Sequence, residues 1–180
     1  MNIEYEVRVL EIDVLNFQKK LEELGAVKKW ERLQKRYTYD FTPKRDNSWV
    51  RLRTNGEETT ITIKTVVDKN DLGGTQEHEV VVSDFEKMND ILEKLGYKHR
   101  NYQENKRIRY ILDEVEIDID TWPLIPTYAE IEGKNKEVVI AILKKLDYFG
   151  SDKVTTLDVT SIYNDIYNID VLNIKELYFN

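Results

Sequence analysis

Strand after strand in this chain alternates charged with apolar side chains at a period of two, the pattern of β-strands that have one apolar face. Arg51 and Arg53 flank Leu52, for example, and Arg107 and Arg109 flank Ile108. A polar face that merely contacts water usually mixes Ser, Thr, Gln and Asn with charges, whereas here nearly every polar position is Glu, Asp, Arg or Lys. The alternation therefore predicts an antiparallel sheet that gathers charge on one face, although it does not itself decide which face is inside.

Two amphipathic segments indicate where the apolar face of that sheet goes. Residues 14–24 and 85–95 each carry apolar side chains at spacings of three and four, which lie on one side of a helix. Such helices need an apolar partner, and the apolar face of the sheet is the only extensive one. If they cover it from outside and the sheet curls, the charged face lines a barrel, and about eight strands leave room for side chains or one small ligand. The expected fold is α+β: a closed antiparallel β-barrel, or tunnel, of about eight strands with a charged interior and helices packed outside.

The chain also contains an internal repeat, which looks like a duplicated strand–helix–strand unit. Residues 4–9 recur as 77–82, and the helices and the segments after them repeat at an offset of 71 residues. A third helix is expected over about residues 136–146, and a shorter one after Thr160. Each copy of the repeat has an aspartate suited to cap its helix and a glycine suited to end it: Asp13 and Gly25, then Asp84 and Gly96.

Length, charge and composition exclude several classes of protein. The 180 residues suit one domain, 1–180, with residues 151–180 as a possible helical flap or dimer contact. The absence of cysteine excludes disulfides and thiolate metal sites, and two histidines are too few for a histidine-rich site. A net charge of −7 argues against nucleic acid as a partner. No segment suits a membrane span or a secretory signal, so we expect a cytoplasmic protein.

The charges on the polar face of the sheet point to a ligand. Buried ions without partners are costly, so a cavity that holds so many is expected to bind a complementary molecule. Carboxylates without histidine or cysteine suit Mg²⁺ or Mn²⁺, and clustered arginines suit phosphate oxygens. The implied ligand is a metal-bound polyphosphate. The candidate carboxylates are Glu4, Glu6, Glu77, Glu79, Glu116, Asp118, Asp120, Glu130 and Glu132, and the candidate cations are Arg8, Arg51, Arg53, Lys64, Arg107 and Arg109.

An ordered set of motifs resembles the CYTH superfamily, the triphosphate tunnel metalloenzymes, which include class IV adenylyl cyclases, thiamine triphosphatases and tripolyphosphatases. The Glu-x-Glu-x-Lys signature of that family reads Glu4-Tyr5-Glu6-Val7-Arg8 here. The matches run in family order from residue 3 to about residue 146. The further matches are Arg51-Leu52-Arg53, Thr62-Ile63-Lys64, Glu77-His78-Glu79, Lys106-Arg107-Ile108-Arg109-Tyr110, Ile119-Asp120 and Glu130-Ile131-Glu132.

The resemblance implies a role for each candidate. One or two Mg²⁺ or Mn²⁺ ions would be held by Glu4, Glu6, Asp120, Glu130 and Glu132, with Glu77, Glu79 and Asp118 as possible additions. The triphosphate of ATP, tripolyphosphate or thiamine triphosphate would be bound by Arg8, Arg51, Arg53, Lys64, Arg107 and Arg109. Of these, the expected catalytic residues are Arg8, Arg53 and Lys64.

One departure from the family pattern bears on the reaction. Arg8 stands where the family usually has lysine, and an arginine is not deprotonated in a protein, so it cannot act as a general base on water. This favours conversion of ATP to cyclic AMP and pyrophosphate, in which the substrate supplies its own hydroxyl. The alternatives are a triphosphate phosphohydrolase and a polyphosphate- or nucleotide-binding protein without catalysis. A homodimer is a further possibility.

Overall fold

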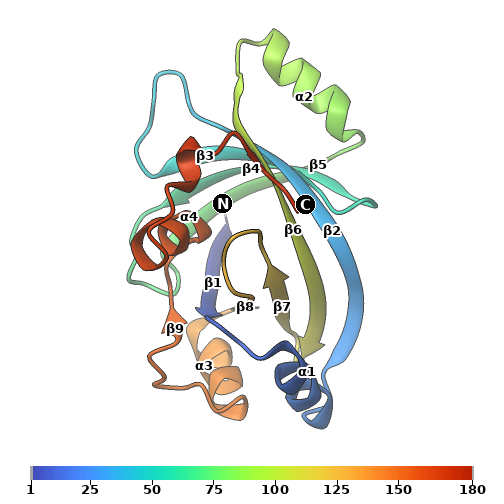
Figure 1. The fold of residues 1–180 in the computed structure, drawn as a ribbon, viewed down its shortest axis with the longest axis vertical. Coiled ribbons are helices and arrows are strands. Elements are labelled where there is room, and N and C mark those ends of the chain that lie inside the picture. The colour runs from blue at the N-terminus through green and yellow to red at the C-terminus, as the bar shows by residue number, and fades with distance from the viewer. Residues whose placement is uncertain (1, 180) are drawn as a thin grey trace.

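Eight strands close into a barrel in the computed structural model, which describes residues 2–179 (Figure 1). They are β1 (Asn2–Val9), β2 (Val27–Tyr39), β3 (Ser48–Thr54), β4 (Thr59–Val66), β5 (Thr75–Val82), β6 (His99–Leu112), β7 (Val115–Thr121) and β8 (Tyr128–Gly133). Neighbours follow the order β6-β2-β3-β4-β5-β1-β8-β7, all antiparallel, and pairing of β7 with β6 closes the ring. The predicted fold class is confirmed.

The helices lie outside the barrel. Figure 1 shows α1 (Val14–Glu23) and α3 (Lys136–Lys145) together at one end of the molecule and α2 (Phe85–Lys94) at the other. No helix within residues 2–179 is both long and apolar enough to cross a membrane. The chain ends in short elements, namely β9 (Val154–Thr155), α4 (Val159–Ser161), a π-helical turn (Ile162–Ile166), a 3-10 turn (Val171–Asn173) and β10 (Glu176–Leu177).

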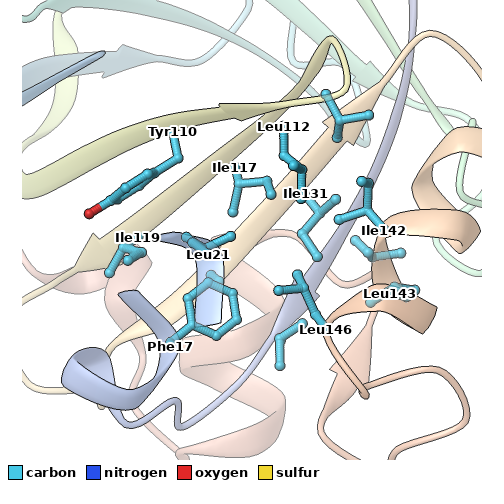
Figure 2. Close-up of a cluster of buried hydrophobic side chains, with 14 of the residues drawn as sticks. Phe17, Leu21, Tyr110, Leu112, Ile117, Ile119, Ile131, Ile142, Leu143 and Leu146 are labelled. Carbon is cyan, nitrogen blue, oxygen red and sulfur yellow. The ribbon is translucent and has the colours of Figure 1, made fainter. Parts of the chain in front are cut away.

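The largest apolar core lies between the outer face of the barrel and the helices α1 and α3. Burying these side chains stabilises the fold by roughly 1.5–3 kcal/mol each. A smaller cluster beneath α2 contains Tyr39, Leu52 and Leu92. The apolar face of the sheet is thus covered from outside, which leaves the charged face for the interior. In Figure 2 the side chains of the main core converge from both helices and from the strands: Phe17, Leu21, Ile142, Leu143 and Leu146 meet Tyr110, Leu112, Ile117, Ile119 and Ile131.

The two halves of the repeat meet through equivalent strands. β2 pairs antiparallel with β6, and Gln34 lies directly opposite Asn105, its counterpart at the offset of 71 residues. The two copies are therefore related across this strand pair by an approximate twofold axis. β6 begins at His99, well before residue 107, where the predicted strand starts, because pairing with the long strand β2 extends it to His99.

The predicted helix boundaries are also confirmed. The side chain of Asp13 accepts a hydrogen bond from the backbone N–H of Asn16, and Asp84 does the same for Lys87. Gly25 follows α1 with a φ of 83°, a left-handed conformation that glycine adopts without strain. Gly96 follows α2 with a φ of 93°.

The C-terminal residues after α3 run along one side of the barrel (Figure 1). β9 pairs with the end of β1, and β10 pairs with β6 in parallel. Between them, Ile162 and Tyr163 pack against Trp122 in an apolar cluster, and the Tyr163 hydroxyl donates a hydrogen bond to the carbonyl of Pro123. This segment therefore contacts the end of the barrel that contains the β7–β8 connection.

Candidate functional site

Charged side chains of the strands line a cavity of about 330 Å³ inside the barrel. On β1 the alternation is direct: Val7 and Val9 belong to the outer apolar core, whereas Glu6 and Arg8 line the cavity and are only 8% and 4% exposed. The buried Asp118 and Asp120 contact Arg107 but do not line the cavity themselves. The other candidate carboxylates and cations all line it, namely Glu4, Glu6, Arg8, Arg51, Arg53, Lys64, Glu77, Glu79, Arg107, Arg109, Glu116, Glu130 and Glu132.

Three of the predicted metal ligands come together. Glu6, Glu130 and Glu132 each offer a carboxylate oxygen, and these oxygens lie within 4.8 Å of one another. Burial, together with Glu6 and Glu130, raises the pKa of Glu132 to about 7. Like charges this close repel strongly, and a bound cation would relieve the repulsion. Clustered carboxylate oxygens are the donor set of a hard divalent cation, so the residues present fit such an ion.

Arg8 lies beside this carboxylate cluster. Its guanidinium is 2.9 Å from an oxygen of Glu6 and 2.6 Å from one of Glu130, and it also donates to the carbonyl of Leu157. Although burial opposes the charge, Glu6 and Glu130 raise the pKa of Arg8 well above its ordinary value. Against the effect of burial, Arg8 and Arg107 hold the pKa of Glu130 well below its ordinary range. Arg8 is thus a fixed cation that orients two of the three carboxylates.

Lys64 holds a second acidic pair. Its ammonium lies 3.1 Å from a carboxylate oxygen of Glu4 and also contacts Glu77. Burial raises the pKa of Glu4 to about 9, helped by Glu6 and Glu77 and opposed by Lys64. Against the effect of burial, Lys64 and Arg51 lower the pKa of Glu77. Glu4 therefore lies with Lys64 rather than in the Glu6–Glu130–Glu132 group.

Arg107 is the most heavily paired cation of the interior. It contacts Asp118 at 2.6 Å, Asp120 at 2.5 Å and Glu130 at 3.1 Å. Both oxygens of Asp120, which is fully buried, accept hydrogen bonds from this one guanidinium. Asp120 thus anchors Arg107, and Arg107 in turn reaches the edge of the carboxylate cluster.

Arg109 is less buried than Arg107. Its guanidinium binds Asp118 at 2.6 Å and Glu116 at 2.7 Å, and lies 5.1 Å from the centre of the Trp30 ring.

Arg51 and Arg53 on β3 are paired more loosely. Arg51 is 3.7 Å from Glu77 and 3.4 Å from Glu79, and Arg53 reaches only Glu79, at 4.0 Å. Burial, together with Arg51 and Arg107, lowers the pKa of Arg53 to about 10. Repulsion among these arginines would be relieved by an anion, so this side of the cavity suits phosphate oxygens.

The cavity contains residues that were not among the predicted site residues. Arg36 and Thr38 reach it from β2, Trp49 from β3 and Trp122 from the β7–β8 connection. The signal for Arg36 was present in the sequence, because Arg36 is the counterpart of Arg107 at the repeat offset. The sequence gives no such signal for the tryptophans, because strand propensity and packing explain a lone tryptophan as well as a place in the cavity does.

The CYTH domain model matches residues 2–156. The chain belongs to the CYTH family. This confirms the resemblance seen in the motifs, and the charged barrel is the tunnel that the resemblance implies. No curated protein matches the chain.

Solved structures share this fold at low sequence identity. The PH1012 protein of Pyrococcus horikoshii OT3 is 22% identical, with a TM-score of 0.73 over 86% of this chain and 95% of that one. A Vibrio parahaemolyticus protein proposed to be an adenylate cyclase is 14% identical, with a TM-score of 0.72 over 84% and 92%. HpAC1 of Hippeastrum, proposed to be an adenylyl cyclase and described as having a dominant triphosphatase activity, is 17% identical, with a TM-score of 0.61 over 94% and 97%. At these identities the likeness concerns the fold alone.

Proposed function

We propose that this CYTH domain is a divalent-metal-dependent enzyme that acts on a triphosphate-bearing small molecule inside its tunnel. The observation that carries this proposal is the division of charge within one cavity: Glu6, Glu130 and Glu132 lie within 4.8 Å of one another on β1 and β8, and the loosely paired Arg51 and Arg53 project from β3. The carboxylates suit Mg²⁺ or Mn²⁺, and the arginines suit phosphate oxygens. A bound ion would neutralise charge that develops on the transferring phosphoryl group.

The first candidate reaction is cyclisation of ATP to cyclic AMP and pyrophosphate. The 3′-hydroxyl oxygen would attack the α-phosphorus while the bond to the pyrophosphate leaving group breaks, and the hydroxyl proton is lost to solvent. Arg8 favours this reaction over hydrolysis because it is a permanent cation, paired with Glu6 and Glu130, at the position where the family usually has lysine. The remaining cations would orient the triphosphate.

The second candidate is hydrolysis of a triphosphate, and Glu132 favours it. No basic side chain within residues 2–179 forms an ion pair with Glu132, so no cation of the protein already neutralises its carboxylate. It could therefore accept a proton from an attacking water in place of a lysine.

One experiment separates these reactions. The protein is incubated with ATP, thiamine triphosphate and inorganic tripolyphosphate, each with Mg²⁺ and with Mn²⁺, and the products are identified by phosphorus NMR. Cyclic AMP with pyrophosphate supports the cyclase, and phosphate without a cyclic product excludes it in favour of the hydrolase. Binding without turnover under every condition would identify a binding protein.

A matched pair of variants ties the activity to the tunnel. Glu6→Gln removes one charge from the carboxylate cluster and is expected to reduce turnover at least about a hundredfold. Glu137→Gln removes the same charge from the exposed surface of α3 and is expected to leave turnover unchanged. Equal activity in both variants would contradict the assignment of the tunnel as the active site.

A further inference from the structure

Arg36 is a buried cation that has no carboxylate partner. It lies on the inner face of β2, is only 6% exposed and lines the tunnel. Among residues 2–179, no carboxylate oxygen lies within 4.0 Å of its guanidinium. Its donors instead reach the amide oxygens of Gln34 and Asn105, and the amide nitrogen of Asn105 donates a hydrogen bond to Asp120. Every other arginine of the tunnel wall has a carboxylate within 4.0 Å.

The position of Arg36 makes this isolation costly. Arg36 lies directly opposite Arg53 in the pairing of β2 with β3, and like charges that face each other across a sheet destabilise it. Burial, with repulsion from Arg53, Arg51 and Arg107, lowers the pKa of Arg36 well below its ordinary value. Two arginines that face each other on adjacent strands, one of them buried, are better explained by an anion that binds to both.

Hydrogen-bond donors at the same place lack acceptors. The Nε of Arg36 and the Nε1 of Trp122 are both buried without a partner. The two side chains are adjacent, since the Arg36 guanidinium lies 4.4 Å from the centre of the Trp122 ring. A buried donor without an acceptor costs roughly 1–3 kcal/mol, which an oxygen-rich anion would recover.

The C-terminal segment contacts this part of the tunnel. Thr160 and Val171 line the cavity together with Asp158, whose carboxylate is already engaged in capping α4. Tyr163 packs edge-on against Trp122, at 6.3 Å between ring centres. The C-terminal segment thus forms part of the tunnel wall beside Trp122 and Arg36, so an organic group at Arg36 would have to share this space with Thr160 and Val171.

We propose that Arg36, together with Arg53, binds the terminal, unesterified phosphate of the substrate beside the C-terminal segment. This rests on the proposed function, because it assumes that the tunnel takes a triphosphate. It also predicts which substrates are accepted. The substrate has one unesterified phosphate, which binds at Arg36, and any organic group lies nearer the carboxylate cluster or the far end of the tunnel.

The test compares Arg36→Gln with Lys35→Gln, which removes the same charge one residue away on the exposed outer face of β2. Binding of inorganic tripolyphosphate is measured by isothermal titration calorimetry in EDTA, where metal-dependent turnover does not occur. Arg36→Gln is expected to weaken binding about tenfold or more, as befits the loss of charge-assisted hydrogen bonds, and Lys35→Gln to leave it unchanged. Equal weakening in both variants, or in neither, would overturn the proposal.

Thermal unfolding of the empty proteins distinguishes binding from a structural role. If Arg36 serves the ligand, Arg36→Gln removes a repulsive pair, so the empty variant unfolds no lower than wild type while its stabilisation by tripolyphosphate shrinks. A lower unfolding temperature with unchanged stabilisation by tripolyphosphate would show that Arg36 is structural.

A second probe tests the free phosphate end. Diadenosine triphosphate carries three phosphates but no unesterified terminus, so it is expected to bind at least about tenfold more weakly than ATP. Arg36→Gln should weaken ATP binding without weakening that of diadenosine triphosphate, and the reverse result contradicts the proposal. Wild-type protein that binds no triphosphate would overturn both this proposal and the proposed function, whereas binding without turnover would overturn the function alone.

Discussion

Glu6 on β1 lies directly opposite Glu132 on β8, and Glu132 lies in turn opposite Glu116 on β7. Three neighbouring strands thus place carboxylates side by side on the inner face of the barrel. Facing like charges destabilise a sheet, so the arrangement opposes folding unless protons or cations neutralise it. The stability of the protein and its affinity for metal should therefore both depend on pH.

The first prediction concerns Glu132. Its pKa is raised to about 7 in the folded protein from an ordinary value of 4.5, so the folded state binds more protons than the unfolded state between these pH values. Stability that is complete below pH 4.5 is accordingly lost as the pH rises to 7. In EDTA, urea unfolding at pH 5 and pH 7 should show the wild-type free energy of unfolding fall by roughly 1–3 kcal/mol.

The matched variant isolates this residue. Glu132→Gln cannot ionise, so its loss of stability over the same pH range should be clearly smaller than that of wild type. Some loss remains because the pKa of Glu4 is also raised, to about 9. An identical pH dependence in the two proteins would show that Glu132 titrates normally. Metal affinity should rise with pH over the same interval, because protons and the cation compete for the carboxylates.

The second prediction concerns Arg53, whose nearest carboxylate, Glu79, is 4.0 Å away. Removing it leaves no closely paired buried acid behind, so Arg53→Ala should keep the fold. An arginine that acts on a transferring phosphoryl group can contribute about 10³-fold, so turnover should fall by orders of magnitude. Steady-state kinetics of Arg53→Ala and of Arg45→Ala, an exposed arginine outside the tunnel, provide the comparison. Normal turnover by Arg53→Ala would remove it from the site.

The third prediction concerns Arg107, whose removal should lower the stability of the fold, unlike the removal of Arg53. Three carboxylates lie within 3.1 Å of it, and Arg107→Ala would leave them buried without their cation. Breaking a buried pair in this way costs roughly 3–5 kcal/mol. Denaturant unfolding should show this loss at pH 7 and a smaller one at low pH, where Asp120, whose pKa is already raised by burial, becomes protonated in the variant. A loss below 1 kcal/mol at pH 7 would mean that the network is already solvated.

Much of this fold could be predicted because the same alternation of charged and apolar side chains recurs in most of the strands. Alternation placed Glu6 and Arg8 on one face and Val7 on the other, and the apolar helices required that Val7 face outward. The repeat was readable for a similar reason, since Asp13 and Asp84 cap equivalent helices and Gln34 meets its counterpart Asn105.

The grouping of side chains within the tunnel was less predictable. Sequence places Glu4 and Glu6 on one face, but only the closed barrel shows that Glu6 joins Glu130 and Glu132 while Glu4 reaches Lys64. Register between strands that are distant in the chain decides this, and local patterns do not encode it. Arg36 was not among the predicted site residues, because the adjacent Lys35 interrupts the alternation of charged with apolar side chains there.

The last prediction concerns Arg8, whose side chain joins Glu6, Glu130 and the carbonyl of Leu157. Arg8→Lys restores the residue usual in the family and keeps a cation beside the same carboxylates. Lysine can lose a proton whereas arginine cannot, so the variant gains a group able to activate water. With ATP and Mn²⁺, phosphorus NMR should show more free phosphate relative to cyclic AMP than wild type gives. An unchanged product ratio would mean that residue 8 positions phosphate and carboxylates only, and that the choice of reaction lies elsewhere in the tunnel.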